Sequence, residues 1–149
     1  MNAAFRRLWF SAGAANLGDG LVLTALPLIA LGAGASAGQI ALVTTLMTLA
    51  WPVFGLHAGW IVDRVPVPRL LAFVNAARAV AVAMLAVGIA LDGPVVPLVF
   101  GAALIYGVAE TLVDTSLIAV IPAVVPPSRL TTANSRMEAT VNVANQLAG

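Results

Sequence analysis

Long apolar runs, separated by short breaks, dominate the chain. No residue between Asp19 and Asp63 is charged, and this interval is far longer than the roughly 20 residues that cross a bilayer as a helix. The run must therefore turn. The stretch GAGASAG (32–38) is the favoured place, because small, flexible residues interrupt helices. The pattern predicts membrane-spanning helices at about 8–31 and 39–62.

Two further spans and the start of another follow. DGPVVP (92–97) separates apolar runs at about 70–91 and 97–120, because glycine and two prolines do not continue a helix. A polar connector is expected over 121–139, and the chain turns apolar again at about 137–149. A helix over this last segment would cover only about 20 Å of a core of about 30 Å. We therefore expect the sequence to be the truncated front part of a longer protein.

Composition assigns these helices to a membrane. The chain is 61% hydrophobic and 9% charged, with a mean hydropathy of +1.03, whereas soluble domains are about 45–50% apolar and about 25% charged. We predict an all-α integral membrane protein whose surroundings are the lipid bilayer. The absence of cysteine excludes disulfides and thiolate metal sites. We find no phosphate loop, nucleophile–base pair, metal-ligand set or nucleic-acid face, and expect no enzyme activity, cofactor, metal or nucleic-acid partner.

The arginines indicate the orientation. Six of the seven lie before the first span or in alternate connectors, whereas segments 32–38 and 92–97 carry no positive residue. These six are Arg6, Arg7, Arg64, Arg69, Arg129 and Arg136. The positive-inside rule places them in the cytoplasm. We expect a multi-pass protein of the cell inner (plasma) membrane with a cytoplasmic N-terminus.

The connector GWIVDRVPVPRLL (59–71) holds the densest cluster of charge. Gly59, Asp63, Arg64 and the later Arg69 lie between the second and third spans. In composition and place this connector resembles the signature loop of the major facilitator superfamily, although Pro66 stands where that family usually has glycine. By this resemblance, the loop latches the two halves of a transporter on the cytoplasmic side and releases during transport. In the other interpretation, it is only a positively charged anchor on the cytoplasmic side.

Two other segments resemble one branch of the same family. FRRLWFSAGAANLGDGL (5–21) is similar to the opening of drug and siderophore exporters, and 121–149 to their passage from helix 4 into helix 5. The resemblance implies part of the N-terminal six-helix half of this fold, and a secondary transporter that works by alternating access. It implies export of a small organic molecule, such as a drug or siderophore, coupled to protons. It also implies a missing C-terminal part, without which the chain is expected to be inactive.

Four ionisable residues fall inside the predicted spans: Asp19, Arg78, Glu110 and Asp114. Each costs at least about 2.5–3.5 kcal/mol to insert and is a functional candidate by default. Comparable depths make a network of Asp19, Arg78 and Glu110 feasible. In one interpretation Asp19 or Glu110 binds the coupling proton or a cationic substrate. In the other, Arg78 neutralises one acid permanently and only specifies packing. Asp114 lies nearer the interface, where solvation or pairing with Arg129 or Arg136 is expected.

For three residues of the second span the sequence predicts helix packing. Gly55 and Gly59 form a small-xxx-small pair that lets another helix approach closely. His57 stands alone, with no second ligand at metal spacing, and burial in a helix contact is expected for it.

The alternative function belongs to a different class. A self-contained four-span membrane protein would act as an oligomeric small exporter or as a partner-binding scaffold. A small four-helix exporter has shorter loops and needs no partial fifth span, and a scaffold needs no ionisable residues inside its spans. These features favour the transporter interpretation.

Overall fold

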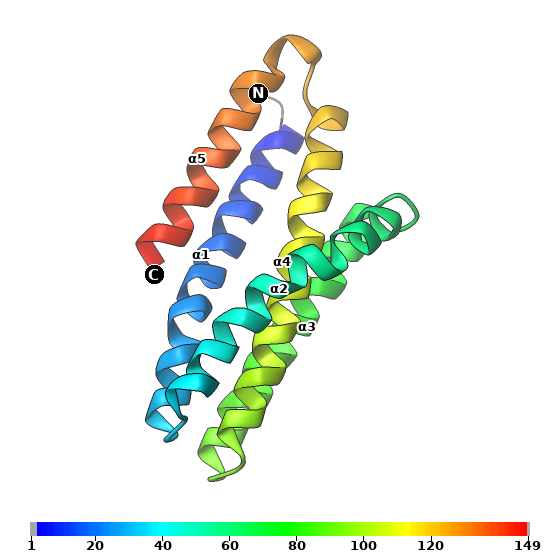
Figure 1. Cartoon of the computed structure of the whole chain (residues 1–149). Helices are drawn as coiled ribbons and strands as arrows, with labels where there is room; N and C mark the ends of the chain where they lie inside the picture. Colours follow the sequence, from blue (N-terminus) through cyan, green and yellow to red (C-terminus); the bar gives the residue numbers. More distant parts are fainter. Residues whose placement is uncertain (1–2, 149) are drawn as a thin grey trace. The chain divides into compact units, whose positions relative to one another are not determined.

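The computed structural model describes residues 3–148, and their side chains over 5–144. This part of the chain forms helices and turns, without strands. In chain order these are α1 (Ala3–Gly32), α2 (Ala37–Val62), α3 (Val67–Ala90), α4 (Val95–Val124), the 3₁₀ turn η1 (Pro127–Arg129) and α5 (Leu130–Ala148) (Figure 1). Helices α1 to α4 are long and apolar enough to cross a membrane. The prediction of an all-α fold with four spans is confirmed.

The connections between the spans are short because the sequence stops each helix sharply. Gly34 closes α1 with a φ of +79°, and the Ala35 N–H donates to the Ala30 carbonyl at 3.0 Å. Asp92 closes α3 in the same way with a φ of 50°, and the Gly93 N–H donates to the Gly88 carbonyl at 2.8 Å. A left-handed residue followed by such a bond is a common helix ending. The predicted turn 32–38 contains the end of α1 and the start of α2, and the predicted turn 92–97 contains the start of α4, whereas α3 ends two residues earlier at Ala90.

The start of α2 is fixed by its own side chains. Ser36 is the N-cap, and its hydroxyl accepts a bond from the Gln39 N–H at 3.3 Å. The Gln39 side-chain oxygen accepts in return from the Ser36 N–H at 2.8 Å. This reciprocal arrangement satisfies backbone donors that a helix start leaves free.

The expected connector over 121–139 is mostly helical, which corrects that part of the sequence analysis. Helix α4 continues to Val124, and α5 begins at Leu130 rather than near 137. The α-helical path is interrupted only over 125–129, around Pro126 and Pro127, because proline lacks the N–H that a continuing helix needs. The mostly polar residues that follow, from Leu130 on, form the first turns of α5. Polar side chains are compatible with a helix wherever they can be solvated by water.

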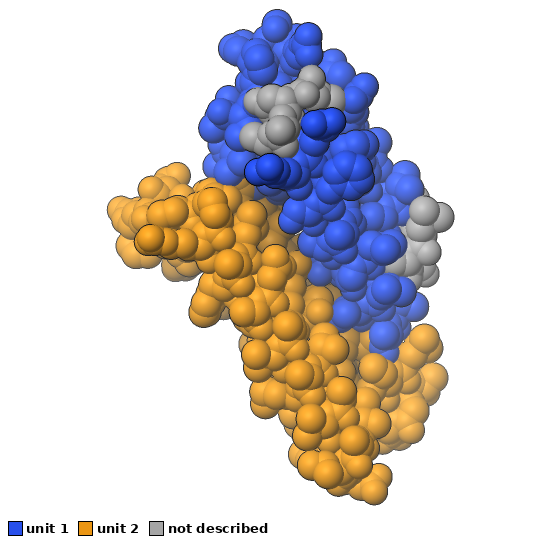
Figure 2. Space-filling view, turned by 180° about the vertical axis from the view of Figure 1, so that it is seen from behind, with its two compact units in different colours: residues 1–25, 117–149 blue, residues 26–116 orange. Residues whose placement is uncertain are grey.

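The chain divides into two compact units, which Figure 2 colours separately. One unit holds residues 26–116, namely α2, α3, the end of α1 and most of α4. Helices α2 and α4 approach closely at Gly107 of α4, where a Cβ atom would lie 2.5 Å from the Met47 carbonyl oxygen of α2. Glycine at that point lets the two backbones approach, as in other membrane-helix contacts.

The other unit holds residues 1–25 and 117–149. Within it α1 and α5 lie side by side, and the Trp9 indole N–H donates to the Thr140 hydroxyl at 2.7 Å. One turn further along α1, a Cβ atom on Gly13 would lie 3.0 Å from the Thr140 methyl group. A polar bond next to a small residue is a typical contact between membrane helices.

Large apolar side chains cover much of the outer surface. Leu56 is 90% exposed, Ile118 76% and Phe73 71%. Exposed apolar patches of this kind mark surfaces that contact a membrane or a partner protein. Here lipid is the expected contact, because the helices that carry these side chains are long and apolar enough to cross a membrane.

Candidate functional site

Arg78 lies on the inward face of α3. The buried residues of that helix are Leu70, Val74, Arg78, Ala81 and Leu85, which follow the spacing of one helix face. Only 5% of the arginine is exposed. A guanidinium buried within an apolar span is costly, so the surrounding residues must compensate for its charge.

The ring of Tyr106 supplies part of that compensation. The Arg78 guanidinium carbon lies 5.4 Å from the centre of the Tyr106 ring on α4, and 8% of the tyrosine is exposed. A desolvated contact between a cation and an aromatic face is worth about 2 kcal/mol. Sequence reasoning did not select Tyr106. The available signal was that the chain contains one tyrosine, placed four residues before a membrane carboxylate.

Helix α4 continues the polar face beyond the tyrosine. Residues spaced by four share one face of a helix, so Tyr106, Glu110 and Asp114 form a row. Burial falls along it: Tyr106 is buried, Glu110 is half-buried and Asp114 is exposed. The structure thus brings Arg78 to one end of a row that contains two of the predicted carboxylates.

Asp19 is the remaining intramembrane acid. It is 8% exposed on α1, and Asn16, one turn earlier, is 3% exposed and donates to the Ala12 carbonyl at 2.9 Å. Asp19 belongs to the unit of residues 1–25 and 117–149, whereas Arg78 and Glu110 belong to the other. The network that would join these three residues remains a prediction.

The charged connector between α2 and α3 is exposed at Asp63, Arg64 and Arg69. Asp63 ends α2, and its N–H donates to the Gly59 carbonyl at 3.1 Å. Arg64 folds back on α2: its guanidinium lies 4.3 Å from the centre of the Trp60 ring and donates to the Trp60 carbonyl at 3.1 Å. Asp63 and Arg69 therefore remain accessible to groups outside the chain.

The glycines before this connector face open space. A Cβ atom on Gly55 or Gly59 would meet no atom within 4 Å, so the close helix contact expected there is not made by the described residues. His57 beside them is exposed, which corrects the expectation of burial; its ring packs edge-on to Phe54 with centroids 6.5 Å apart.

A comparison with known families gives one match. The pattern described as Major Facilitator Superfamily matches residues 8–149, nearly the whole chain. Neither the curated proteins nor the solved structures contain a match.

Proposed function

The chain belongs to the Major Facilitator Superfamily, and from this premise we propose that it forms part of one half of a proton-coupled exporter of small organic molecules. In this proposal a second half completes the substrate cavity, and the two halves alternate between openings to either side of the membrane. The observation that carries the proposal is the polar row of α4, with Arg78 beside Tyr106 and Glu110 one turn further along.

This row has the properties that proton coupling needs. A carboxyl group in apolar surroundings favours its neutral form, whereas a nearby cation favours its charged form. The row offers both influences to Glu110, which is half-buried on the same helix face as the ring that contacts Arg78. A conformational change that alters the water access of such an acid would load or release a proton. Asp19, buried in α1, is the second candidate.

The exposed connector supports the same function. The side chains of Asp63 and Arg69 are exposed, and Gly55 and Gly59 leave room for a helix to approach α2. We assign this surface to contact with the second half, released and remade in each cycle. We assign the connector and the N-terminus to the cytoplasmic side of the inner (plasma) membrane, and the arginine distribution supports this assignment. The likeness of 5–21 to drug and siderophore exporters supports export and a substrate of that class.

Neutralising Glu110 tests the proposal. In cells that carry the complete transporter, Glu110→Gln should reduce ethidium efflux driven by a proton gradient to the rate of cells without the protein. Asp19→Asn should do the same. The reason is that an amide of the same shape keeps the packing but cannot release a proton. Ethidium fluorescence in energised cells, with and without a protonophore, measures the rate.

The matched control is Asp92→Asn, which removes an acid from an exposed turn outside the spans. It should leave efflux unchanged. Wild-type efflux that persists after the proton gradient is collapsed, or full activity of both neutral variants, would contradict proton coupling through these acids. Wild-type cells that retain ethidium like empty cells would contradict export of drugs of this kind.

A further inference from the structure

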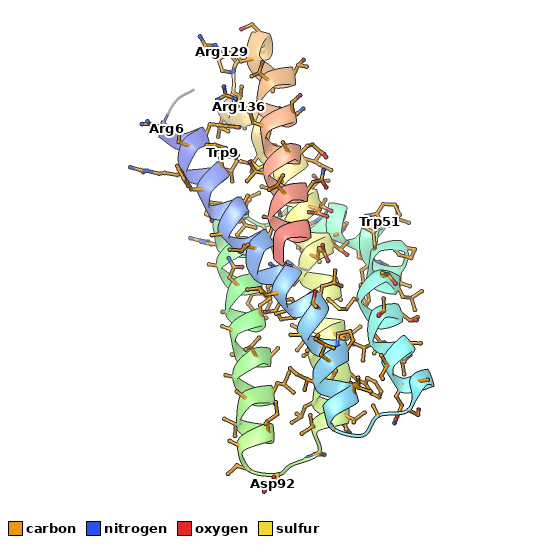
Figure 3. All side chains as sticks on the ribbon, turned by 90° about the vertical axis from the view of Figure 1, so that its left-hand side faces the viewer. Arg6, Trp9, Trp51, Asp92, Arg129 and Arg136 are labelled. Carbon is orange, nitrogen blue, oxygen red and sulfur yellow. The ribbon has the colours of Figure 1, made fainter. Side chains whose placement is uncertain are left out.

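A basic cavity lies in the unit of residues 1–25 and 117–149. Its volume is about 660 Å³. Three arginines from three elements line it: Arg6 of α1, Arg129 of η1 and Arg136 of α5. Figure 3 shows them gathered near the same end of this unit, with Trp9 close by. No carboxylate is among the described residues of the lining. The cavity therefore favours an anion.

The position of the cavity in the spans narrows the choice of anion. Its wall includes Phe5, where the first span begins, and Val124, where the fourth span ends. Both residues mark the passage from apolar helix to polar connector. The cavity thus opens at the boundary of the hydrocarbon region, which is the depth of lipid phosphates.

An apolar groove adjoins the cavity. It runs between α1 and α5, has a volume of about 580 Å³, and is lined by Phe10, Leu17 and Val143 among others. Trp9 lines both the basic cavity and this groove. The two spaces therefore meet at one side chain, with cationic groups on one side of it and hydrocarbon on the other.

We propose that the cavity and groove together bind one anionic phospholipid. Its phosphate enters the arginine cavity, where planar guanidinium groups donate paired hydrogen bonds to phosphate oxygens. One acyl chain lies in the groove beyond Trp9. Basic pockets at the ends of membrane helices are known to hold such head groups. A soluble phosphate would contact only the arginines, whereas a phospholipid would also fill the apolar groove with its acyl chain.

Trp9 provides a direct readout. In a Trp51→Phe, Trp60→Phe background it is the one tryptophan left, because the chain has three. The purified chain is placed in phosphatidylcholine vesicles that contain a small fraction of lipid with brominated acyl chains, which quench nearby indole fluorescence. Brominated phosphatidylglycerol should quench Trp9 more strongly than brominated phosphatidylcholine at equal fraction. Each arginine contact is worth about fivefold in affinity, so Arg129→Gln should lower this preference about fivefold.

The matched control removes arginines from the other connector. Arg64→Gln with Arg69→Gln changes the net charge more than Arg129→Gln does, yet should leave the preference intact. Equal quenching by the two brominated lipids would overturn the proposal, and so would a preference that Arg6→Gln and Arg129→Gln leave unchanged. Saturation by millimolar inorganic phosphate in detergent, without selective quenching in vesicles, would also overturn it and assign the cavity to a soluble anion. Circular dichroism of each variant verifies that the helices are retained.

Discussion

Alanine in place of Gly107 should destabilise the chain by about 2–3 kcal/mol, near the upper end of the cost of overpacking. The added Cβ atom would lie 2.5 Å from the Met47 carbonyl oxygen and 2.9 Å from both the Met47 Cα and the Ala50 Cβ. Two of these three atoms are backbone, so they cannot rotate away. Helices α2 and α4 must therefore move apart to make room for the added methyl group, and the packing contacts between the two helices around position 107 are lost.

Gly101 is the matched control for this substitution. It lies on the same helix, is exposed, and has no atom within 4 Å of a Cβ placed there. Alanine at that site should be neutral, or stabilising by up to about 1 kcal/mol through helix propensity. Thermal unfolding of both variants in the same detergent measures the difference. Similar melting temperatures would show that α2 and α4 do not pack through Gly107.

Methionine in place of Arg78 should destabilise the chain by about 3–5 kcal/mol and abolish transport by the complete transporter. The reason is that Arg78 is the one buried arginine among the described residues, and the four spans also contain the acids Asp19, Glu110 and Asp114. Removing a buried charge that balances others leaves them uncompensated, which carries a cost of this size. Methionine retains the length and apolar volume of the side chain, so the loss of stability and transport measures the effect of removing the charge.

Two further variants separate charge from ring contact. Tyr106→Phe keeps the aromatic face that lies 5.4 Å from the guanidinium, so it should retain the ring contact and lose only what the hydroxyl group contributes. Tyr106→Leu removes the face and should cost about 2 kcal/mol. Unfolding in detergent and ethidium efflux in cells provide the two readouts. An Arg78→Met variant with wild-type stability would show that the arginine does not balance charge within the spans.

The spans were readable from the sequence because each depends on local composition. Apolar runs long enough to cross the bilayer, ended by Gly34 or by the residues around Asp92, dictate α1 to α4 with little help from tertiary contacts. The start of α5 was missed for the opposite reason. Its first residues are polar, and hydropathy alone does not distinguish a helix at the membrane surface from a loop.

The site was only partly predictable. An acid or arginine inside a span stands out in any sequence, which is why Arg78 and Glu110 were found. Tyr106 and Gly107 were not, because their roles depend on which helix lies opposite them. Nothing local distinguishes Gly107 from Gly101, and only the approach of α2 makes one indispensable and the other replaceable.

The proposed transport function requires that the polar row of α4 faces a water-filled pathway with changing access. The chain contains no cysteine, so a single cysteine can be introduced at position 110 of α4 and, as a control, at position 80 of α3. Val80 is 57% exposed on an apolar surface, two residues from buried Arg78 and therefore at similar depth. A membrane-impermeant thiol reagent that reacts only in water should modify position 110. Position 80 should remain unmodified. Equal protection of both positions would show that Glu110 is packed away from water, and would contradict the proposed transport function.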